Sequence, residues 1–140
     1  MKVAVDTNIL VRAAVGDDEH QQKLASEILR ESESVAVTLP ALCEFAWVLS
    51  RTYRISPAQV ATSIRSLVGA SNVECESEAV EAGLVMLDAG GDFADGVIAF
   101  EGRRLGGDVF VTFDKESAKL LQRSGARVSL PSAIDLPRTQ

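Results

Sequence analysis

Four acidic residues beside or within apolar segments are this chain's best candidates for chemistry. Asp6 directly follows the Val-rich run KVAV, and Asp114 directly follows VFVTF. Asp95 lies in the stretch GDFADGVIAF, and Glu44 lies in LPALCEFAWVLSR. Carboxylates that converge without a cationic cluster repel one another, and a divalent cation relieves that repulsion. With no His or Cys among them, these oxygens favour Mg²⁺ or Mn²⁺ over zinc, and such ions serve phosphate chemistry.

Each aspartate also has an ordinary structural explanation. Asp is common at strand-to-helix turns and at helix caps, which would account for Asp6 and Asp114. Asp92 and Asp95 have the three-residue spacing of a capping box, with Asp in place of the usual Glu or Gln. Acids in a first helical turn also suit the positive end of the helix dipole. Each aspartate, considered alone, therefore fits a helix cap as well as it fits a catalytic or metal-binding role.

Glu44 and Asp95 are expected on partly buried helix faces. Glu44 falls beside Trp47 at the edge of an apolar arc, where an unpaired carboxylate costs several kcal/mol. Arg51 lies seven residues on and could pair with Glu44 in a plain surface network. Asp95 shares its face with small residues such as Ala99, which would let the helix approach the sheet and bring Asp95 toward the core.

The composition narrows the class of protein. Hydrophobic residues make up 46% and charged residues 24%, and no apolar run approaches the ~20 residues that span a bilayer. The apolar run of the N-terminus is too short for a signal peptide. The single His20, in a charged run, argues against a His-rich zinc site and His-based catalysis. Cys43 and Cys75 are too few for a secreted disulfide scaffold, so both are expected as reduced thiols in a cytoplasmic, non-membrane protein.

The charge pattern argues against a nucleic-acid binder with a general basic surface, because the net charge is −6. Residues 101–140 differ from the rest, with 7 basic and 5 acidic side chains. A polyanion is best tolerated there. Two bivalent ions on the four candidate acids would cancel much of the remaining negative charge.

Apolar runs and helical periods alternate along the chain, without repeats or linkers. Strands are expected at 2–5, 34–39, 72–75, 108–113 and 126–130. Helices are expected at 8–15, capped by Thr7 or Asn8, and at 20–32, 41–53, 57–68, 77–89, from GDFADG onward, and at 115–125. Such alternation predicts one α/β domain over 1–140, with a mostly parallel sheet covered on both faces. Ligands in these sheets lie at the carboxyl ends of the strands.

Four segments together resemble the PIN-domain ribonuclease family. They are VAVDTNIL, LPALCEFAWVLSR, FADGVIAF and VTFD, in this order over the whole chain. The short length resembles the VapC-type toxins of type II toxin–antitoxin systems. The resemblance implies a PIN-like three-layer α/β/α fold with the first and fourth strands adjacent. It also implies a Mg²⁺- or Mn²⁺-dependent endoribonuclease, a homodimer, and a cognate VapB-like antitoxin that blocks the acidic site.

The resemblance places the family's metal-binding and catalytic acids at Asp6, Glu44, Asp95 and Asp114. Polar neighbours that would orient carboxylates or waters are Thr7, Asn8 and Thr112. Asp92 matches an auxiliary acid, and Arg51 and Lys115 are candidates for phosphate contact. Gly96 departs from the Ala usual in the family, which weakens a helix by up to ~1 kcal/mol. The implied reaction is hydrolysis of an RNA phosphodiester, with metal-bound hydroxide as the simplest nucleophile.

Three other functions fit the sequence less well. A phosphatase of the haloacid dehalogenase type needs a second Asp two residues after its nucleophile, where this chain has Asn8. A receiver-type phosphoacceptor needs an acidic pair at the first strand end, which is not visible. A PIN-like module that only binds RNA or protein predicts the loss of at least one acid, and all four are present.

Overall fold

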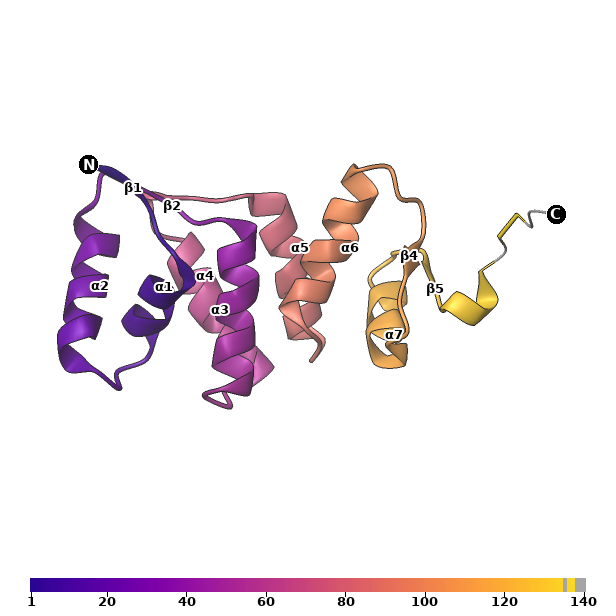
Figure 1. The fold of residues 1–140 in the computed structure, drawn as a ribbon, viewed down its shortest axis with the longest axis horizontal. Helices are drawn as coiled ribbons and strands as arrows, with labels where there is room; N and C mark the ends of the chain where they lie inside the picture. The colour runs from indigo at the N-terminus through magenta and orange to yellow at the C-terminus, as the bar shows by residue number, and fades with distance from the viewer. Residues whose placement is uncertain (135, 138–140) are drawn as a thin grey trace.

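The computed structural model describes residues 1–134, 136 and 137 as an elongated chain of short strands and longer helices (Figure 1). The strands are β1 (Lys2–Ala4), β2 (Ser34–Ala36), β3 (Val73–Glu74), β4 (Phe110–Val111) and β5 (Val128–Ser129). The helices are α1 (Thr7–Ala14), α2 (Glu19–Glu31), α3 (Leu39–Arg51), α4 (Pro57–Val68), α5 (Ser77–Asp88), α6 (Phe93–Arg104) and α7 (Lys115–Arg123). A short 3₁₀ turn covers Pro131–Ala133. Residue 135 and residues 138–140 of the expected single domain lie outside the described part.

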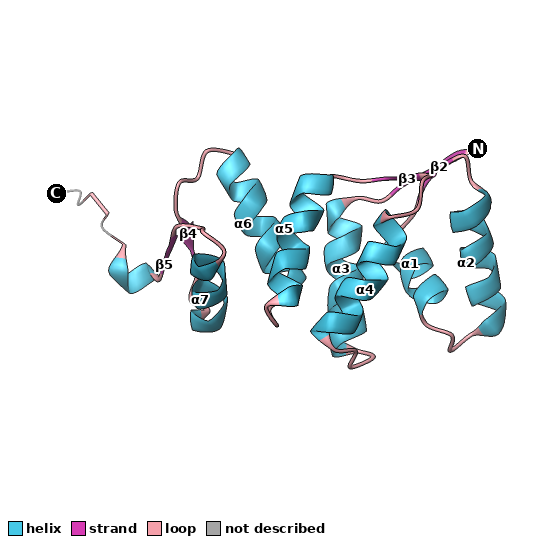
Figure 2. Cartoon of the chain, turned by 180° about the vertical axis from the view of Figure 1, so that it is seen from behind, coloured by secondary structure: helices cyan, strands magenta, loops and turns pink. Residues whose placement is uncertain are grey.

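All strand pairing in the described part of the chain is parallel. One sheet has the order β1-β2-β3, with Val3 opposite Val35 and Val35 opposite Val73. A second sheet holds only β4 and β5, with Phe110 opposite Val128. Figure 2 shows both sheets as short segments among the helices. The alternation of strands and helices and the parallel sheet are confirmed, and the helix-rich α/β fold is consistent with the expected three-layer α/β/α class.

The expected adjacency of the first and fourth strands is corrected by this topology. β4 pairs with β5, whereas β1 pairs with β2 alone among the described residues. Helices α3, α5 and α6 lie between β1 and β4 along the long axis of the molecule (Figure 1). The chain leaves α6 on the side away from β1, so β4 forms beside β5 instead of entering the first sheet.

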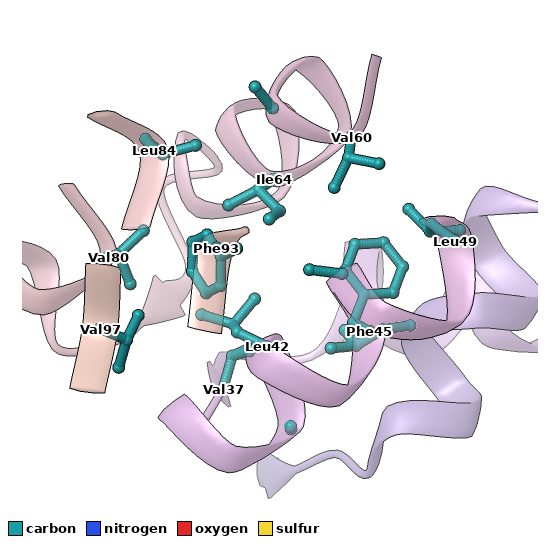
Figure 3. Close-up of a cluster of buried hydrophobic side chains, with 14 of the residues drawn as sticks. Val37, Leu42, Phe45, Leu49, Val60, Ile64, Val80, Leu84, Phe93 and Val97 are labelled. Carbon is teal, nitrogen blue, oxygen red and sulfur yellow. The ribbon is translucent and has the colours of Figure 1, made fainter. Parts of the chain in front are cut away.

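The hydrophobic core explains why α6 is fixed in this position. Phe93 is 0% exposed and packs with Leu42, Ile64 and Val97 inside one cluster of buried side chains (Figure 3). A buried aromatic side chain of this kind contributes roughly 1.5–3 kcal/mol relative to an exposed one. α6 is therefore anchored against helices that precede it in the chain.

Two glycines allow α5 and α6 to approach each other closely. A Cβ atom at Gly83 would collide with the Phe93 ring, and one at Gly96 would collide with the backbone carbonyl of Ala82. The tightest contact of α6 is thus made to α5 through Gly96, whereas Ala99 and Gly102 line a cavity beside Val109 and Phe110 at the second sheet. The same packing gives a reason for glycine at position 96, which the sequence presented only as a helix-weakening departure.

Polar and proline residues start the helices much as the sequence predicts. Ser56 caps α4 by accepting a hydrogen bond from the Gln59 amide, with Pro57 in the first turn. α3 begins two residues before the expected start and is capped by the Thr38 hydroxyl. The strands are shorter than expected, since each apolar run places only two or three residues in a ladder.

The remaining composition-based expectations concern single residues and membrane spans. His20 is exposed, and Cys43 and Cys75 are free thiols. No helix in the described ranges combines the length and apolarity that crossing a membrane requires.

Candidate functional site

Three of the candidate acids begin helices. The carboxylate of Asp6 caps α1 by accepting from the Ile9 amide at 3.1 Å, in place of the expected Thr7 or Asn8. Asp92 caps α6 through the Ala94 amide at 3.3 Å. Asp114 caps α7 through the Ser117 amide at 3.0 Å. The capping explanation therefore holds for all three, and each carboxylate lies at the positive end of a helix dipole.

Asp95 lies in the first turn of α6 and is half-buried. The Ser117 hydroxyl donates a hydrogen bond of 2.5 Å to its Oδ2 atom. Burial raises the pKa of Asp95 above its ordinary value, and the negative charges of Asp92 and Asp114 raise it further, whereas the bond from Ser117 opposes them. The fold thus disfavours the ionised form of Asp95. A carboxylate with a raised pKa is common at functional sites.

Asp114 has the opposite electrostatic environment. The backbone amide of Ser117 is the main cause that lowers the pKa of Asp114, with the Ser117 side chain and the Glu116 amide adding to it. The Thr112 hydroxyl accepts a hydrogen bond of 3.0 Å from the Asp114 amide, so Thr112 orients the backbone at this position. Asp114 is therefore held ionised beside a carboxylate, Asp95, that is harder to ionise.

A cavity of about 380 Å³ lies at the first turns of α6 and α7, against α3. Its acidic lining is Asp92, Asp95, Asp114 and Glu116, and its other polar or aromatic lining includes Trp47, Ser50, Arg51 and Ser117. Arg51 is thus brought together with three predicted acids. Lys115 is exposed and does not line this cavity. A cation beside several carboxylates suits a site that binds a phosphate group together with a divalent ion.

The sequence alone does not distinguish Ser117, Trp47 or Glu116 as site residues. Ser117 had a readable signal, because it falls on the same face of α7 as the buried Ala118 and Leu121. A polar residue on an apolar helix face needs a partner, and here that partner is Asp95. The sequence indicates Trp47 only as a neighbour of Glu44 at the edge of the apolar arc.

Asp6 and Glu44 lie outside this cavity. Both side chains are exposed, and neither lines the pocket. The Thr7 hydroxyl donates to the Ala41 carbonyl oxygen at 3.3 Å, which ties the residue after Asp6 to the first turn of α3. Asn8 is exposed. Among the described ion pairs, none joins Glu44 to Arg51, so the alternative explanation of Glu44 by a surface network with Arg51 is not supported.

Within one chain the candidate acids fall into two groups. Asp92, Asp95 and Asp114 share the cavity, whereas Asp6 caps α1 and Glu44 lies in α3. No cluster of three or more His, Cys, Asp or Glu side chains in the described residues has an arrangement that could hold a metal ion. The donor chemistry therefore fits a hard cation, but the geometry of a single chain does not complete its site.

Cys43 lies on α3 beside Glu44 and is half-buried. Burial, and secondarily the negative charge of Asp92, raise the pKa of its thiol to about 11. At neutral pH the thiol is protonated and is a poor nucleophile or metal ligand. The side chain packs against the hydrophobic core cluster.

Comparison with known proteins identifies the family. A search among curated proteins gave no match. The PIN domain family matches residues 3–121, a range that contains all four candidate acids and every residue of the cavity. PIN domains are typically nucleases, which places the chain at a coarse level among nuclease-type hydrolases. Because the match spans most of its 140 residues, the chain belongs to the PIN-domain family.

Proposed function

We propose that this protein is an endoribonuclease that depends on Mg²⁺ or Mn²⁺ and hydrolyses RNA phosphodiester bonds. The observation that carries the proposal is the cavity in which Asp92, Asp95 and Asp114 meet Arg51. PIN nucleases usually use divalent metal ions, and oxygen-only donors suit Mg²⁺ or Mn²⁺. The cation of Arg51 favours a substrate with phosphate groups.

The residues divide into metal-binding and supporting roles under this proposal. Asp6, Glu44, Asp95 and Asp114 are the proposed metal-binding and catalytic acids. Thr112 fixes the backbone at Asp114, and Thr7 fixes the chain after Asp6. Asp92 caps α6 and adds negative charge beside Asp95. Arg51 is the stronger candidate for phosphate contact, because Lys115 lies outside the cavity.

We further propose that the protein acts as the toxin of a VapBC-type module. Its expected partners are an RNA substrate, a cognate VapB-like antitoxin and a second copy of the chain. The support for the module is the resemblance of the short chain to VapC-type toxins and its PIN-domain membership. An antitoxin would protect the host by covering the cavity at α6 and α7.

The test of the nuclease is cleavage of labelled RNA by protein purified free of any partner. Wild type is expected to cleave with Mg²⁺ or Mn²⁺ and to stop when EDTA is added. Asp95→Asn and Asp114→Asn should lose cleavage, whereas Asp108→Asn, an exposed acid outside the cavity, should keep it. Equal cleavage by all four proteins would exclude the assigned site. Binding of RNA without cleavage by wild type would instead support a PIN-like binding module.

The test of the toxin is growth after induced expression. Wild type is expected to slow growth, and Asp95→Asn is expected to relieve the effect at equal protein level. If wild type and Asp95→Asn slow growth equally, the growth arrest does not depend on RNA cleavage, and the toxin proposal is contradicted.

A further inference from the structure

Within the described residues, β1, β3, β4 and β5 each have one hydrogen-bonded neighbour and therefore one unpaired edge, and two of these strands, β1 and β4, precede candidate acids. β1 is hydrogen-bonded only to β2, and β4 only to β5, within the described residues. Both strands are parallel to their existing partners, and each is followed by one of the candidate acids, Asp6 or Asp114. An open edge presents a row of unpaired amide and carbonyl groups, which is a template for pairing with another strand.

The edge at β4 also exposes large apolar side chains. Phe113 is 87% exposed, Val111 is 43% exposed, and Leu105 in the preceding turn is 89% exposed. These three residues lie within nine positions of one another in the sequence, on and beside a single strand. Scattered exposed apolar residues are normal, but apolar residues gathered along an open strand edge indicate a surface that pairs.

The packing of α6 and α7 keeps β4 away from β1 of its own chain. α3, α5 and α6 separate the two strands along the long axis in Figure 1 and in Figure 2. α7 is held on α6 by the bond from Ser117 to Asp95, and Leu120 of α7 lies against Gly91 so closely that a Cβ atom there would collide with it. Pairing within the chain would require these contacts to break, whereas pairing with a second chain would leave them in place.

We propose that β1 of one copy pairs in the parallel direction with β4 of a second copy. The pairing is reciprocal, so that β4 of the first copy also pairs with β1 of the second. The dimer would then contain two five-stranded sheets. Each sheet would have the order β3-β2-β1 from one chain, followed by β4-β5 from the other chain. The two-fold arrangement closes, whereas a one-sided pairing would build an open filament. Leu105, Val111 and Phe113 would be covered at the junction.

The pairing also completes the acidic site, and this part of the inference rests on the proposed function. In a joined sheet the carboxyl ends of β1 and β4 meet at one edge, so Asp6 of one copy is placed beside Asp114 of the other. The cavity of each chain already holds Asp95 and Asp114. Each site is then composed of residues from both chains.

Disulfide trapping tests the pairing without any reference to activity. Two proteins that lack Cys43 and Cys75 are co-expressed with different tags, one with Ala4→Cys and one with Thr112→Cys, because the register that places Asp6 beside Asp114 places Ala4 opposite Thr112. Mild oxidation is expected to give a covalent heterodimer. Lys23→Cys, on exposed α2, replaces Ala4→Cys as the control and should give none. A chain carrying both Ala4→Cys and Thr112→Cys should crosslink between chains; a crosslink within one chain, or no crosslink, would overturn the proposal.

Complementation between inactive variants tests the shared site. In a mixed dimer of Asp6→Asn and Asp114→Asn, isolated by its two tags, one site carries both substitutions and the other carries neither. Such a dimer is expected to recover about half of the wild-type cleavage, since one of its two symmetric sites is intact. A mixed dimer of Asp95→Asn and Asp114→Asn should recover none, because both residues come from one chain's cavity.

The two experiments separate the failure of each proposal. If wild type cleaves RNA but the Asp6→Asn and Asp114→Asn pair stays inactive, the shared site is overturned while the nuclease stands. If wild type does not cleave RNA, the proposed function fails and disulfide trapping alone decides whether β1 and β4 pair between chains.

Discussion

The Ser117 hydroxyl donates a 2.5 Å hydrogen bond to Asp95, and this bond joins two helices across the candidate site. The same Ser117 gives its backbone amide to Asp114. One serine therefore stabilises two carboxylates that repel each other. The two hydrogen bonds keep both acids in place, although the partial burial of Asp95 disfavours its ionised form.

Asp95→Asn is expected to raise thermal stability at neutral pH. Burial raises the pKa of Asp95, so the folded state is more stable when this carboxyl group is protonated. That part of the unfolding free energy is lost as pH rises through the pKa of Asp95 in the folded state. The gain of the variant over wild type should therefore shrink as pH falls toward the ordinary Asp value of 3.8 and vanish below it. Thermal melts from pH 3 to pH 8 would measure the difference, and a gain that is independent of pH would contradict the electrostatic cause.

Ser117→Ala is expected to destabilise the protein through Asp95. Removing a hydrogen bond to a charged group costs roughly 1.5–3 kcal/mol. The pKa of Asp95 should rise further, because the lost bond is what lowers it. Denaturant unfolding of both single variants and the double variant would measure the coupling. If Ser117→Ala costs as much in the Asp95→Asn protein as in wild type, the bond is not its cause.

Substitutions at Asp92 are expected to change the stability of the fold, whereas substitution of Asp95 is expected to abolish RNA cleavage. Asp92→Ala removes the cap of α6 and should cost about 1 kcal/mol of unfolding free energy, whereas Asp92→Asn, an equally good cap, should cost little. Asp95→Asn should abolish RNA cleavage while the fold persists. Unfolding curves and RNase assays on the three variants test the division, and loss of cleavage in Asp92→Asn with retention in Asp95→Asn would reverse the assignment.

Gly96→Ala and Gly102→Ala are expected to change stability in opposite directions. An added methyl group at Gly96 would collide with the Ala82 carbonyl, and overpacking of this kind costs typically 1–3 kcal/mol. At Gly102, also within α6, the added methyl group meets nothing within 4 Å, so it should stabilise the helix by up to about 1 kcal/mol. Chemical denaturation compares the two, and a stabilised Gly96→Ala would contradict the close α5–α6 contact.

Arg51→Gln is expected to weaken RNA binding. Binding would be measured in the Asp114→Asn background so that the RNA is not cleaved. If Arg51 contacts a phosphate, the slope of log affinity against log salt should fall by about 1. Arg30→Gln, an exposed arginine on α2 away from the cavity, is the matched control and should leave the slope unchanged. An equal effect of both variants would assign Arg51 only to the general charge of the surface.

Local features of the fold could be predicted from the sequence because they depend on neighbouring residues. Asp92 begins α6, Ser56 with Pro57 begins α4, and the alternation of strands with helices is observed. The cap of α1 shows the limit of such reasoning. Thr7 and Asn8 were as plausible as Asp6, and the choice depends on where the preceding strand releases the chain.

The candidate site was predictable in its residue types but not in its grouping. Asp95, Asp114 and Asp92 share a cavity with Arg51, whereas Asp6 and Glu44 do not reach it within the chain. Ser117 became visible as a site residue only through its bond to Asp95. These relations join segments far apart in the sequence, and no periodicity or spacing encodes them.

The sequence by itself determined the elements, their caps, the family-like acids and the oxygen-only donor chemistry. Tertiary structure decided which strands pair and which acids meet. The physical reason is that strand pairing and helix packing are settled by contacts between distant segments, here the burial of Phe93 and the approach of Gly96 to Ala82. Those contacts fix α6 between β1 and β4, and so keep these two strands apart and leave Asp6 and Glu44 outside the cavity that holds Asp95 and Asp114.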